Sequence, residues 1–202
     1  MYRILLAVLV CFSPFLWAQE STASLSQLLE SNRDVEGEFR QVTYNEQGEQ
    51  VQVSEGVFLL AAPNRFVWDT ISPFPQRIIS DGQLVTIWDV DLEQATQKPF
   101  SSTVGNSPAA LLGESADSVL THYKVEQTSG AKYRLTPNES DDLFNSLTLS
   151  FDNGVIDAMS IKDVLGQITV IEFSNVEAHE GVSDQNFNIN LPESVDLIVE
   201  QP

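Results

Sequence analysis

The residues most often used in catalysis are few in this chain and stand apart from one another. The only histidines, His122 and His179, match no metal-ligand spacing, so each is expected to be an ordinary surface or sheet residue. The only cysteine is Cys11, and the chain contains no G-x-S-x-G, P-loop, H-E-x-x-H or C-x-x-C motif. We therefore predict a protein that is not an enzyme and that has no cofactor and no metal site.

One group of carboxylates resembles a cation site. Asp89, Asp91 and Glu93 alternate as at the beginning of a calcium-binding loop. The glycine that such a loop carries at its sixth position is missing, and so is the distant bidentate glutamate. We therefore expect these residues to form the solvent-facing side of a strand, on which every second side chain points the same way.

The N-terminal segment has the features of a secretory signal peptide. Arg3 precedes a short apolar run, Ile4–Val10, and the small residue Ala18 lies at the boundary with a polar stretch. The apolar run is too short to span a bilayer. We therefore expect residues 1–18 to be removed on export and residues 19–202 to form a single domain outside the cytoplasm.

The exported chain is strongly acidic. Without Arg3 it keeps 29 Asp and Glu against 9 Lys and Arg, a net charge of −20. This charge has the wrong sign for nucleic-acid binding and opposes adsorption to anionic lipid headgroups, so neither nucleic acid nor stable membrane insertion is expected. Two interpretations stay open: a charge that maintains solubility, and an acidic face that steers the protein toward basic partners.

The hydrophobic pattern predicts one large sheet with a few short helices. A first helix is expected over Ser24–Asn32, capped by Ser21 or Ser24. Strand-like segments separated by Gly, Asn, Asp and Pro turns then run from Val35–Tyr44 to Phe187–Asn190. About ten to eleven antiparallel strands indicate a mainly β (α+β) protein, built as one curved sheet or open barrel.

Short helices are expected to interrupt the sheet near its middle. Ser107 is a natural N-cap and Pro108 a natural first helical residue, so a helix should cover Ala109–Leu112. A second helix is expected over Ser115–Leu120. Both are too short to be stable alone, so they must bury their apolar sides against the sheet.

Aromatic residues are the most prominent apolar feature of the expected sheet. Alternation puts Phe66 and Trp68 on one face of their strand and Arg65 on the other, and Phe58 and Leu60 share a face of the strand before it. Such a face fits an ordinary filled core. It fits equally well the wall of a hollow, sized for an apolar ligand, between a concave sheet and its helices.

Six short sequence motifs follow one another over most of the chain. They are Phe39-x-Gln41; Gly56-Val57-Phe58-Leu59 with Pro63-Asn64-Arg65-Phe66-Val67-Trp68; Ile79-Ser80-Asp81-Gly82; Leu92-Glu93-Gln94-Ala95-Thr96; Gly105-Asn106-Ser107-Pro108-Ala109-Ala110-Leu111-Leu112; and Phe187-x-Ile189-x-Leu191-Pro192-x-x-Val195-Asp196. Their order and spacing resemble the LolA family of periplasmic lipoprotein carriers.

The resemblance implies an unclosed antiparallel half-barrel of about 11 strands with a lid of short helices. It implies a non-enzymatic, monomeric chaperone of the periplasm that serves lipoprotein transport and outer-membrane biogenesis. Its partners would be acylated lipoproteins, an inner-membrane lipoprotein-releasing transporter and an outer-membrane receptor lipoprotein. The lipid-binding cavity would be lined by Phe39, Phe58, Leu60, Phe66, Trp68, Ile78 and Leu112, with Leu28, Pro108 and Leu111 in the lid.

One position departs from the family pattern. Family members typically carry an arginine immediately before the Pro-Asn pair, where it ties the lid to the sheet, and here that position is Ala62. Arg65 follows three residues later, on the opposite face from Phe66. An enzyme acting on apolar substrates is disfavoured by the missing catalytic motifs. Two alternatives stay open: a carrier of another lipid or glycolipid, and a stress-sensing binding module. Members of that last family usually add a second domain, whereas this chain ends at Pro202.

Overall fold

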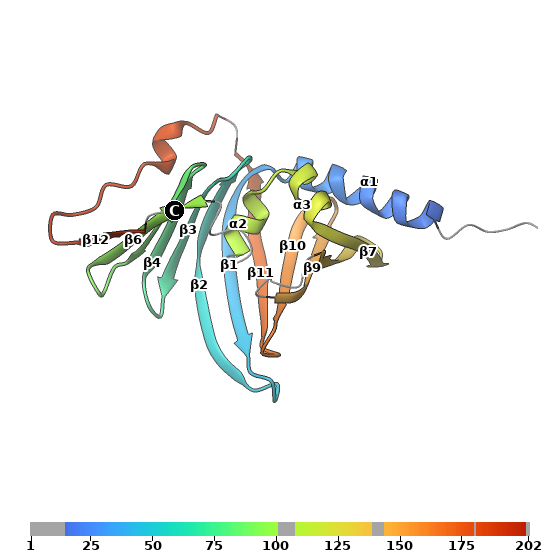
Figure 1. Cartoon of the computed structure of the whole chain (residues 1–202), viewed down its shortest axis with the longest axis horizontal. Helices are drawn as coiled ribbons and strands as arrows, with labels where there is room; N and C mark the ends of the chain where they lie inside the picture. Colours follow the sequence, from blue (N-terminus) through green and yellow to red (C-terminus); the bar gives the residue numbers. More distant parts are fainter. Residues whose placement is uncertain (1–14, 101–107, 139–143, 180, 201–202) are drawn as a thin grey trace, which may run out of the picture.

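The computed structural model describes residues 15–100, 108–138, 144–179 and 181–200, with only the backbone described for 15–20 and 108. Its centre is one sheet of twelve strands, in the order β12-β6-β5-β4-β3-β2-β1-β11-β10-β9-β8-β7 (Figure 1). All neighbours pair antiparallel except β12 and β6, which are parallel. The strands are β1 Asp34–Tyr44, β2 Gln50–Ala61, β3 Arg65–Ser72, β4 Gln76–Asp81, β5 Leu84–Asp89, β6 Gln94–Pro99, β7 Tyr123–Ser129, β8 Lys132–Pro137, β9 Phe144–Asp152, β10 Val155–Asp163, β11 Ile168–Ala178 and β12 Asp196–Val199.

Three helices lie against the concave side of this sheet. They are α1 (Phe15–Ser31), α2 (Pro108–Gly113) and α3 (Ala116–His122). In Figure 1, α2 lies across the middle strands while α1 and α3 lie toward the β7 end. The Ser115 hydroxyl caps α3 by accepting a hydrogen bond from the Ser118 N–H, which satisfies one of the helix's unpaired donors. The unclosed half-barrel with short helices predicted from the sequence is therefore confirmed.

The convex side is covered by the C-terminal segment. A 3₁₀ turn, η2 (Asp184–Phe187), contacts β3 and β4. Its Phe187 is 3% exposed and packs with Leu59, Ala61 and Ile79 in a small cluster separate from the main core. The chain then runs on to β12 beside β6 (Figure 1).

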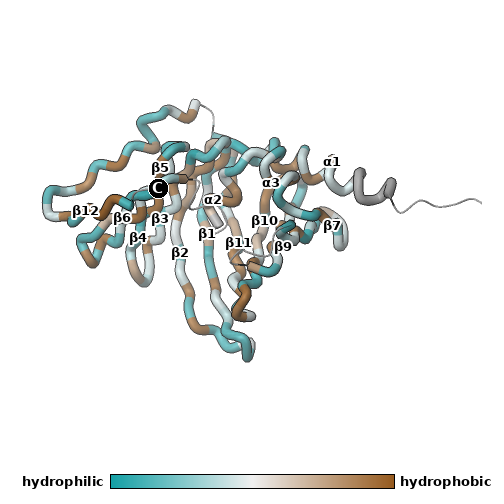
Figure 2. Tube along the Cα trace, in the orientation of Figure 1, coloured by the Kyte–Doolittle hydropathy of each residue, from teal (hydrophilic) through white to brown (hydrophobic). Residues whose placement is uncertain are grey.

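The end of β2 shows the effect of covering both faces. Phe58 and Leu60 belong to the core under the helices, and Leu59 and Ala61 belong to the cluster around Phe187. All four side chains are buried, so the strict alternation of apolar and polar residues seen in other strands is lost here (Figure 2). A strand that is buried on both faces has a continuous apolar sequence.

Two predictions about individual elements were wrong. Helix α1 begins at Phe15, so Ser21 and Ser24 lie inside the helix and not at its N-cap. The Ser24 hydroxyl shares a 2.7 Å hydrogen bond with the Tyr133 hydroxyl. Residues Phe187–Asn190 do not form a strand. Their alternating apolar side chains instead hold a 3₁₀ turn and the irregular segment after it against the convex face. The twelfth strand lies further on, in β12. Among the expected helix signals, Ser107 lies outside the described residues, and Pro108 does begin α2.

The carboxylates Asp89, Asp91 and Glu93 do not line one face of a strand, as the sequence suggested. They occupy the end of β5 and the turn to β6. Glu93 has a left-handed backbone conformation (φ 48°), which does not continue the alternation of side chains along a strand. The Gln76 side chain donates to the Asp89 carboxylate at 2.7 Å, and the Ser194 hydroxyl donates to the Glu93 carboxylate at 3.0 Å. Across the described part of the chain, no three His, Cys, Asp or Glu side chains are close enough to hold a metal ion.

Candidate functional site

Four aromatic side chains from four adjacent strands meet on the concave face. They are Phe39 on β1, Phe58 on β2, Trp68 on β3 and Phe173 on β11, and are called the inner aromatic cluster below. The rings of Phe39 and Trp68 stack with centroids 4.1 Å apart, and Phe58 lies edge-on to Phe173 at 5.2 Å. Trp68 also lies 5.9 Å from Phe58 and 6.3 Å from Phe173. Such contacts add about 0.5–1.5 kcal/mol each beyond area burial.

The strand register brings these rings together. Phe58 is paired with Trp68, and Phe39 is paired with both Phe173 and Gly56. The missing side chain at Gly56 makes room for the Phe39 ring, because a Cβ there would lie 2.7 Å from the Phe39 Cζ and 2.1 Å from the Asp69 carbonyl oxygen. Glycine is therefore required at this position for the close approach of ring and backbone.

Helix α2 forms the cover over this part of the sheet. Its residues Ala109, Ala110, Leu111 and Leu112 are all buried in the same core as the inner aromatic cluster. The two alanines and Gly113 have little bulk, which allows a close approach of the helix backbone to β2 and β3. A Cβ on Gly113 would lie only 3.3 Å from the Phe66 ring.

The C-terminus of α2 is held to the sheet by one backbone hydrogen bond. The Asn64 N–H, in the turn between β2 and β3, donates to the Gly113 carbonyl oxygen at 2.6 Å. The Ser80 hydroxyl on β4 donates to the Asn64 carbonyl oxygen at 2.5 Å and so positions that turn. Burial of Leu111 and Leu112 in the core also holds α2 against the sheet.

The arginine link typical of the family is absent from the described structure. Ala62 is buried, and its backbone is tied to Arg33: the Ala62 N–H donates to the Arg33 carbonyl oxygen at 2.9 Å, and the Arg33 guanidinium donates to the Ala62 carbonyl oxygen at 3.2 Å. Arg65 lies on the convex face, as its alternation with Phe66 predicted. Its guanidinium binds the Asp184 carboxylate at 2.7 Å and lies 5.2 Å from the centre of the Phe187 ring.

The residues predicted to line a cavity are brought together, since all of them lie in or against one core on the concave side. Phe39, Phe58, Leu60, Phe66, Trp68 and Leu112 are buried in that core, and Ile78 packs against it while partly exposed. Among the predicted lid residues, Leu111 is buried, Leu28 on α1 packs against the core, and Pro108 is placed only as the first residue of α2.

Sequence reasoning missed Phe173. The signal was available, because Ile171 and Phe173 are two residues apart on β11 and therefore share a face. The missing information was the pairing of β1 with β11, two strands more than 120 residues apart in sequence, as in the hydrogen bond between Thr43 and Thr169 (separation 126). Alternation within one strand does not show which other strand lies beside it.

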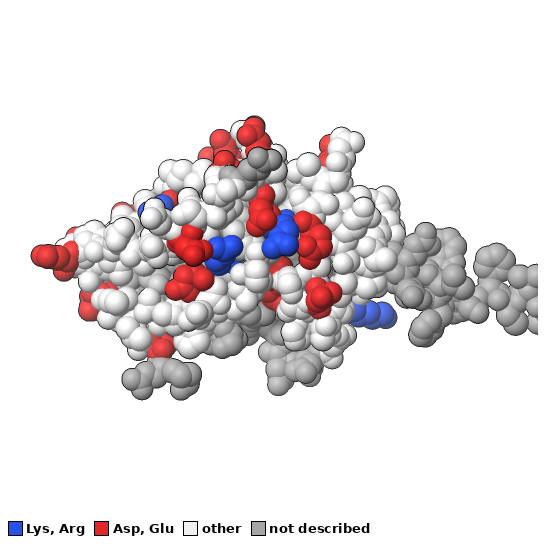
Figure 3. Space-filling view, turned by 90° about the horizontal axis from the view of Figure 1, so that it is seen from above, with Lys and Arg blue, Asp and Glu red and all other residues white. Residues whose placement is uncertain are grey.

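Most charged side chains of the described chain lie on its outside. Glu114, directly after α2, differs: it is 7% exposed and accepts a hydrogen bond from the Ser118 hydroxyl at 2.6 Å. The ion pairs of the described structure, such as Arg40 with Glu55 and Glu172, involve side chains that are at least one quarter exposed, and none includes a residue of the inner aromatic cluster. The face in Figure 3 shows many carboxylates around few basic groups. The four rings of the inner aromatic cluster are uncharged and can bind an apolar chain through the hydrophobic effect.

None of the described helices is both long enough and apolar enough to span a membrane. The helices serve the sheet instead: α1 and α3 pack at its β7 end and α2 over its middle. The inner aromatic cluster and its cover are thus the site whose geometry we compare with known proteins.

Similarity to known proteins agrees with this geometry. The family model described as "Outer membrane lipoprotein carrier protein LolA" matches residues 30–190. An outer-membrane lipoprotein carrier protein from Pseudomonas fluorescens is 36% identical over 202 residues, covering 98% of both chains. One from Alcanivorax borkumensis is 36% identical over 196 residues, covering 95% of this chain and 93% of that one.

A solved structure shows the same fold at lower sequence similarity. A LolA superfamily protein from Nitrosomonas europaea matches with a TM-score of 0.56 and 12% identity, covering 85% of this chain and 97% of its own. At that identity only the fold is comparable. The family match and the two relatives together decide the assignment: the chain belongs to the LolA family of outer membrane lipoprotein carrier proteins.

Proposed function

We propose that this protein carries lipoproteins through the periplasm and that it holds their acyl chains between the inner aromatic cluster and α2. The observation that carries the proposal is a wall of aromatic rings under a six-residue helix whose C-terminus is linked to the described part of the sheet by one backbone hydrogen bond. A carrier needs this combination, because the wall provides affinity for hydrocarbon and the weakly held helix provides access.

The energetics of acyl chains explain why such a site is needed. Each CH₂ group removed from water contributes about 0.8 kcal/mol, so a multiply acylated protein does not leave a membrane for water unaided. A carrier must offer comparable apolar surface during the transfer. The buried aromatic and aliphatic side chains around Phe66 and Trp68 would provide that surface once α2 moves away.

Movement of α2 sets the affinity in this proposal. The closed position is stabilised by the Asn64–Gly113 hydrogen bond and by the burial of Leu111 and Leu112. A ligand that binds only the open form must supply the free energy that opening α2 requires. Its apparent affinity is therefore lower than its affinity for the open form. The cover therefore keeps binding strong enough to accept cargo from a donor and weak enough to release it to an acceptor.

The donor and acceptor follow from the carrier role. We infer that cargo comes from an inner-membrane lipoprotein-releasing transporter and passes to an outer-membrane receptor lipoprotein. The net charge of −20 on the exported chain would repel the protein from anionic membrane surfaces between the two steps. A stress-sensing role is not favoured, because the full-length relatives are named as carriers.

A fluorescence titration tests the site. Trp68 belongs to the inner aromatic cluster, whereas Trp88 lies on β5 outside it. A fatty acid that carries a quencher should reduce tryptophan emission saturably in the exported protein and in the Trp88→Phe variant. The Trp68→Phe variant should lose most of the quenching. Saturable binding with equal quenching in both variants would place the acyl site elsewhere.

A further inference from the structure

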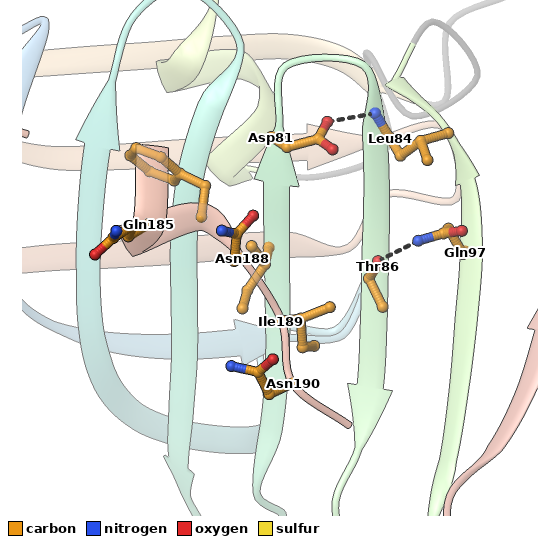
Figure 4. A pocket seen from close by; sticks show the side chains of 10 residues that line it. Asp81, Leu84, Thr86, Gln97, Gln185, Asn188, Ile189 and Asn190 are labelled. Carbon is orange, nitrogen blue, oxygen red and sulfur yellow. Dashed lines mark hydrogen bonds between the residues drawn. The ribbon is translucent and has the colours of Figure 1, made fainter. Parts of the chain in front are cut away.

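The convex side holds a cavity that the carrier function does not use. It has a volume of about 660 Å³ and lies between strands β4, β5 and β6 and the segment 185–190 (Figure 4). We call it the outer pocket. Its volume falls within the range of about 300–1,000 Å³ that is typical of small-molecule sites.

The outer pocket is separated from the inner aromatic cluster by the sheet itself. On β5, Thr86 lines the outer pocket, whereas its neighbours Val85 and Ile87 belong to the core on the concave side. On β4, Ile79 lines the pocket and Ile78 packs against the inner core. Acyl chains held on the concave side therefore leave the outer pocket accessible.

The polar lining consists mainly of uncharged groups. It includes four side-chain amides, one hydroxyl and one carboxylate, from Gln97, Gln185, Asn188, Asn190, Thr86 and Asp81. Figure 4 shows Thr86 and Gln97 on the strand side and Asn188 and Asn190 on the segment that crosses them. No lysine or arginine lines the pocket within the described chain, so it lacks the cations that recognise phosphate or sulfate groups.

Several of these groups are available to a ligand. The side chains of Gln185, Asn188 and Asn190 are exposed and make no hydrogen bond with the described parts of the chain. On the strand side, Gln97 donates to the Thr86 hydroxyl oxygen at 3.2 Å, and that hydroxyl keeps its own proton for donation. A primary amide offers a donor and an acceptor side by side, which matches a pair of neighbouring hydroxyl groups.

The wall formed by the C-terminal segment is already in place. Phe187 anchors it in the apolar cluster on the sheet, and the Arg65–Asp184 ion pair holds its beginning. The Ser183 hydroxyl accepts from the Gln185 N–H at 3.1 Å, and the Asn186 side chain accepts from the Ser183 N–H at 3.0 Å. A preformed wall reduces the ordering cost of binding.

We propose that the outer pocket binds an uncharged carbohydrate. Neighbouring ring hydroxyls would pair with the amides of Asn188, Asn190 and Gln97, and the apolar face of a sugar ring would lie on Leu84 and Ile189. Both of these side chains line the pocket, and Leu84 is exposed. The site is independent of the lipoprotein cargo, so its presence or absence leaves the carrier proposal unchanged.

Chemical-shift mapping on the ¹⁵N-labelled exported protein tests the proposal. N,N′-diacetylchitobiose and maltose serve as neutral disaccharide probes, with tetra-alanine and inorganic phosphate as probes of the competing classes. At least one disaccharide should shift the signals of residues 84–86 and 185–190 saturably. If neither does, or if tetra-alanine or phosphate binds there more tightly, the carbohydrate proposal is wrong.

Variants make the test specific. Asn188→Ala and Asn190→Ala each remove an amide that makes no internal side-chain hydrogen bond, so folding should be retained. Each should weaken disaccharide binding by about fivefold, as expected for one lost hydrogen bond. Gln47→Ala removes an equally exposed amide in the β1–β2 turn and should leave binding unchanged. Unchanged affinity in both asparagine variants would overturn the assignment.

Discussion

The two faces of the sheet are both covered, but by segments of opposite character. On the concave side, α2 covers an aromatic wall and contributes alanine and leucine. On the convex side, the segment around η2 contributes one anchor, Phe187, and otherwise a row of amides. Strands β4 and β5 thus face the apolar core on one side, through Ile78 and Val85, and the polar pocket on the other, through Ile79 and Thr86. Alternation along each strand permits this, because neighbouring side chains point to opposite faces.

The covers are also held differently. Helix α2 is bound to the β2–β3 turn through the Asn64–Gly113 backbone bond, while the convex segment is held by a buried ring and an ion pair. Moving α2 would expose Leu111 and Leu112, whereas moving the convex segment would expose Phe187 and break its ion pair. The proposed carrier function requires the first movement and not the second. Variants on the two sides should therefore affect fatty-acid binding differently.

The largest expected effect comes from placing a charge on the concave side. In Phe66→Glu a carboxylate replaces a side chain that is 0% exposed, at a cost of several kcal/mol unless water enters. We expect loss of fatty-acid binding and a lower free energy of unfolding, measured by fluorescence titration and urea denaturation. Val57→Glu is the matched control, because Val57 lies on the convex side and is 40% exposed. Equal fatty-acid binding by Phe66→Glu and wild type would contradict the proposal that acyl chains bind on the concave side.

A large truncation on the convex side separates stability from carrier function. Phe187→Ala removes a ring that is 3% exposed and should lower the free energy of unfolding by about 3–5 kcal/mol. Fatty-acid affinity of the folded fraction should stay at the wild-type level, because Phe187 packs in the convex cluster, on the opposite side of the sheet from the inner aromatic cluster. Urea denaturation measures the free energy of unfolding, and a fatty-acid titration at low urea concentration measures the affinity. A matching drop in fatty-acid affinity would show that the two sides are energetically coupled.

A smaller effect is expected from restoring the family arginine. In Ala62→Arg a guanidinium next to the Asn64 turn could donate to the last carbonyls of α2, which stabilises the closed form by about 1.5–3 kcal/mol. Uptake of a fluorescent fatty acid should then be slower in stopped-flow measurements. Ala62→Met provides similar length without the charge and should not slow uptake to the same extent. Equal rates in wild type and Ala62→Arg would indicate that α2 opens without a link at this position.

The smallest effect concerns the ion pair on the convex side. Asp184→Asn removes a carboxylate that is 94% exposed from its contact with Arg65, and exposed pairs contribute about 0–1 kcal/mol. The free energy of unfolding should fall by no more than that, and the loss should shrink with added salt. Thermal unfolding at low and high ionic strength measures it. A much larger loss would mean that the ion pair, rather than Phe187, holds the convex segment.

Much of the fold could be predicted from local sequence. Turn residues and alternation located most strands, because a side-chain period of two is visible in the chain itself. The same period placed Phe66 and Trp68 together and Arg65 opposite them, as the structure shows. The resemblance to known carriers, carried by the order of short motifs, predicted the half-barrel and the family.

Other features depended on contacts between segments far apart in the chain. Alternation at Phe187 and Ile189 predicted a strand, but Phe187 instead fills a space on the outer face created by Leu59, Ala61 and Ile79. The parallel pairing of β12 with β6 brings together residues about one hundred positions apart, such as Asp196 and Gln94. Local pattern carries no information about such partners, since a strand offers the same hydrogen-bonding groups to any neighbour.

The sequence by itself determined the class of fold and the apolar face of β2 and β3, and it predicted the export of an acidic chain. Only the tertiary structure decided that Phe173 joins that face, that Ala62 is tied to Arg33 in place of the lid, and that an amide-lined pocket lies behind the carrier site. The physical reason is that side-chain direction is set within one strand, whereas neighbours are set by packing across the whole sheet.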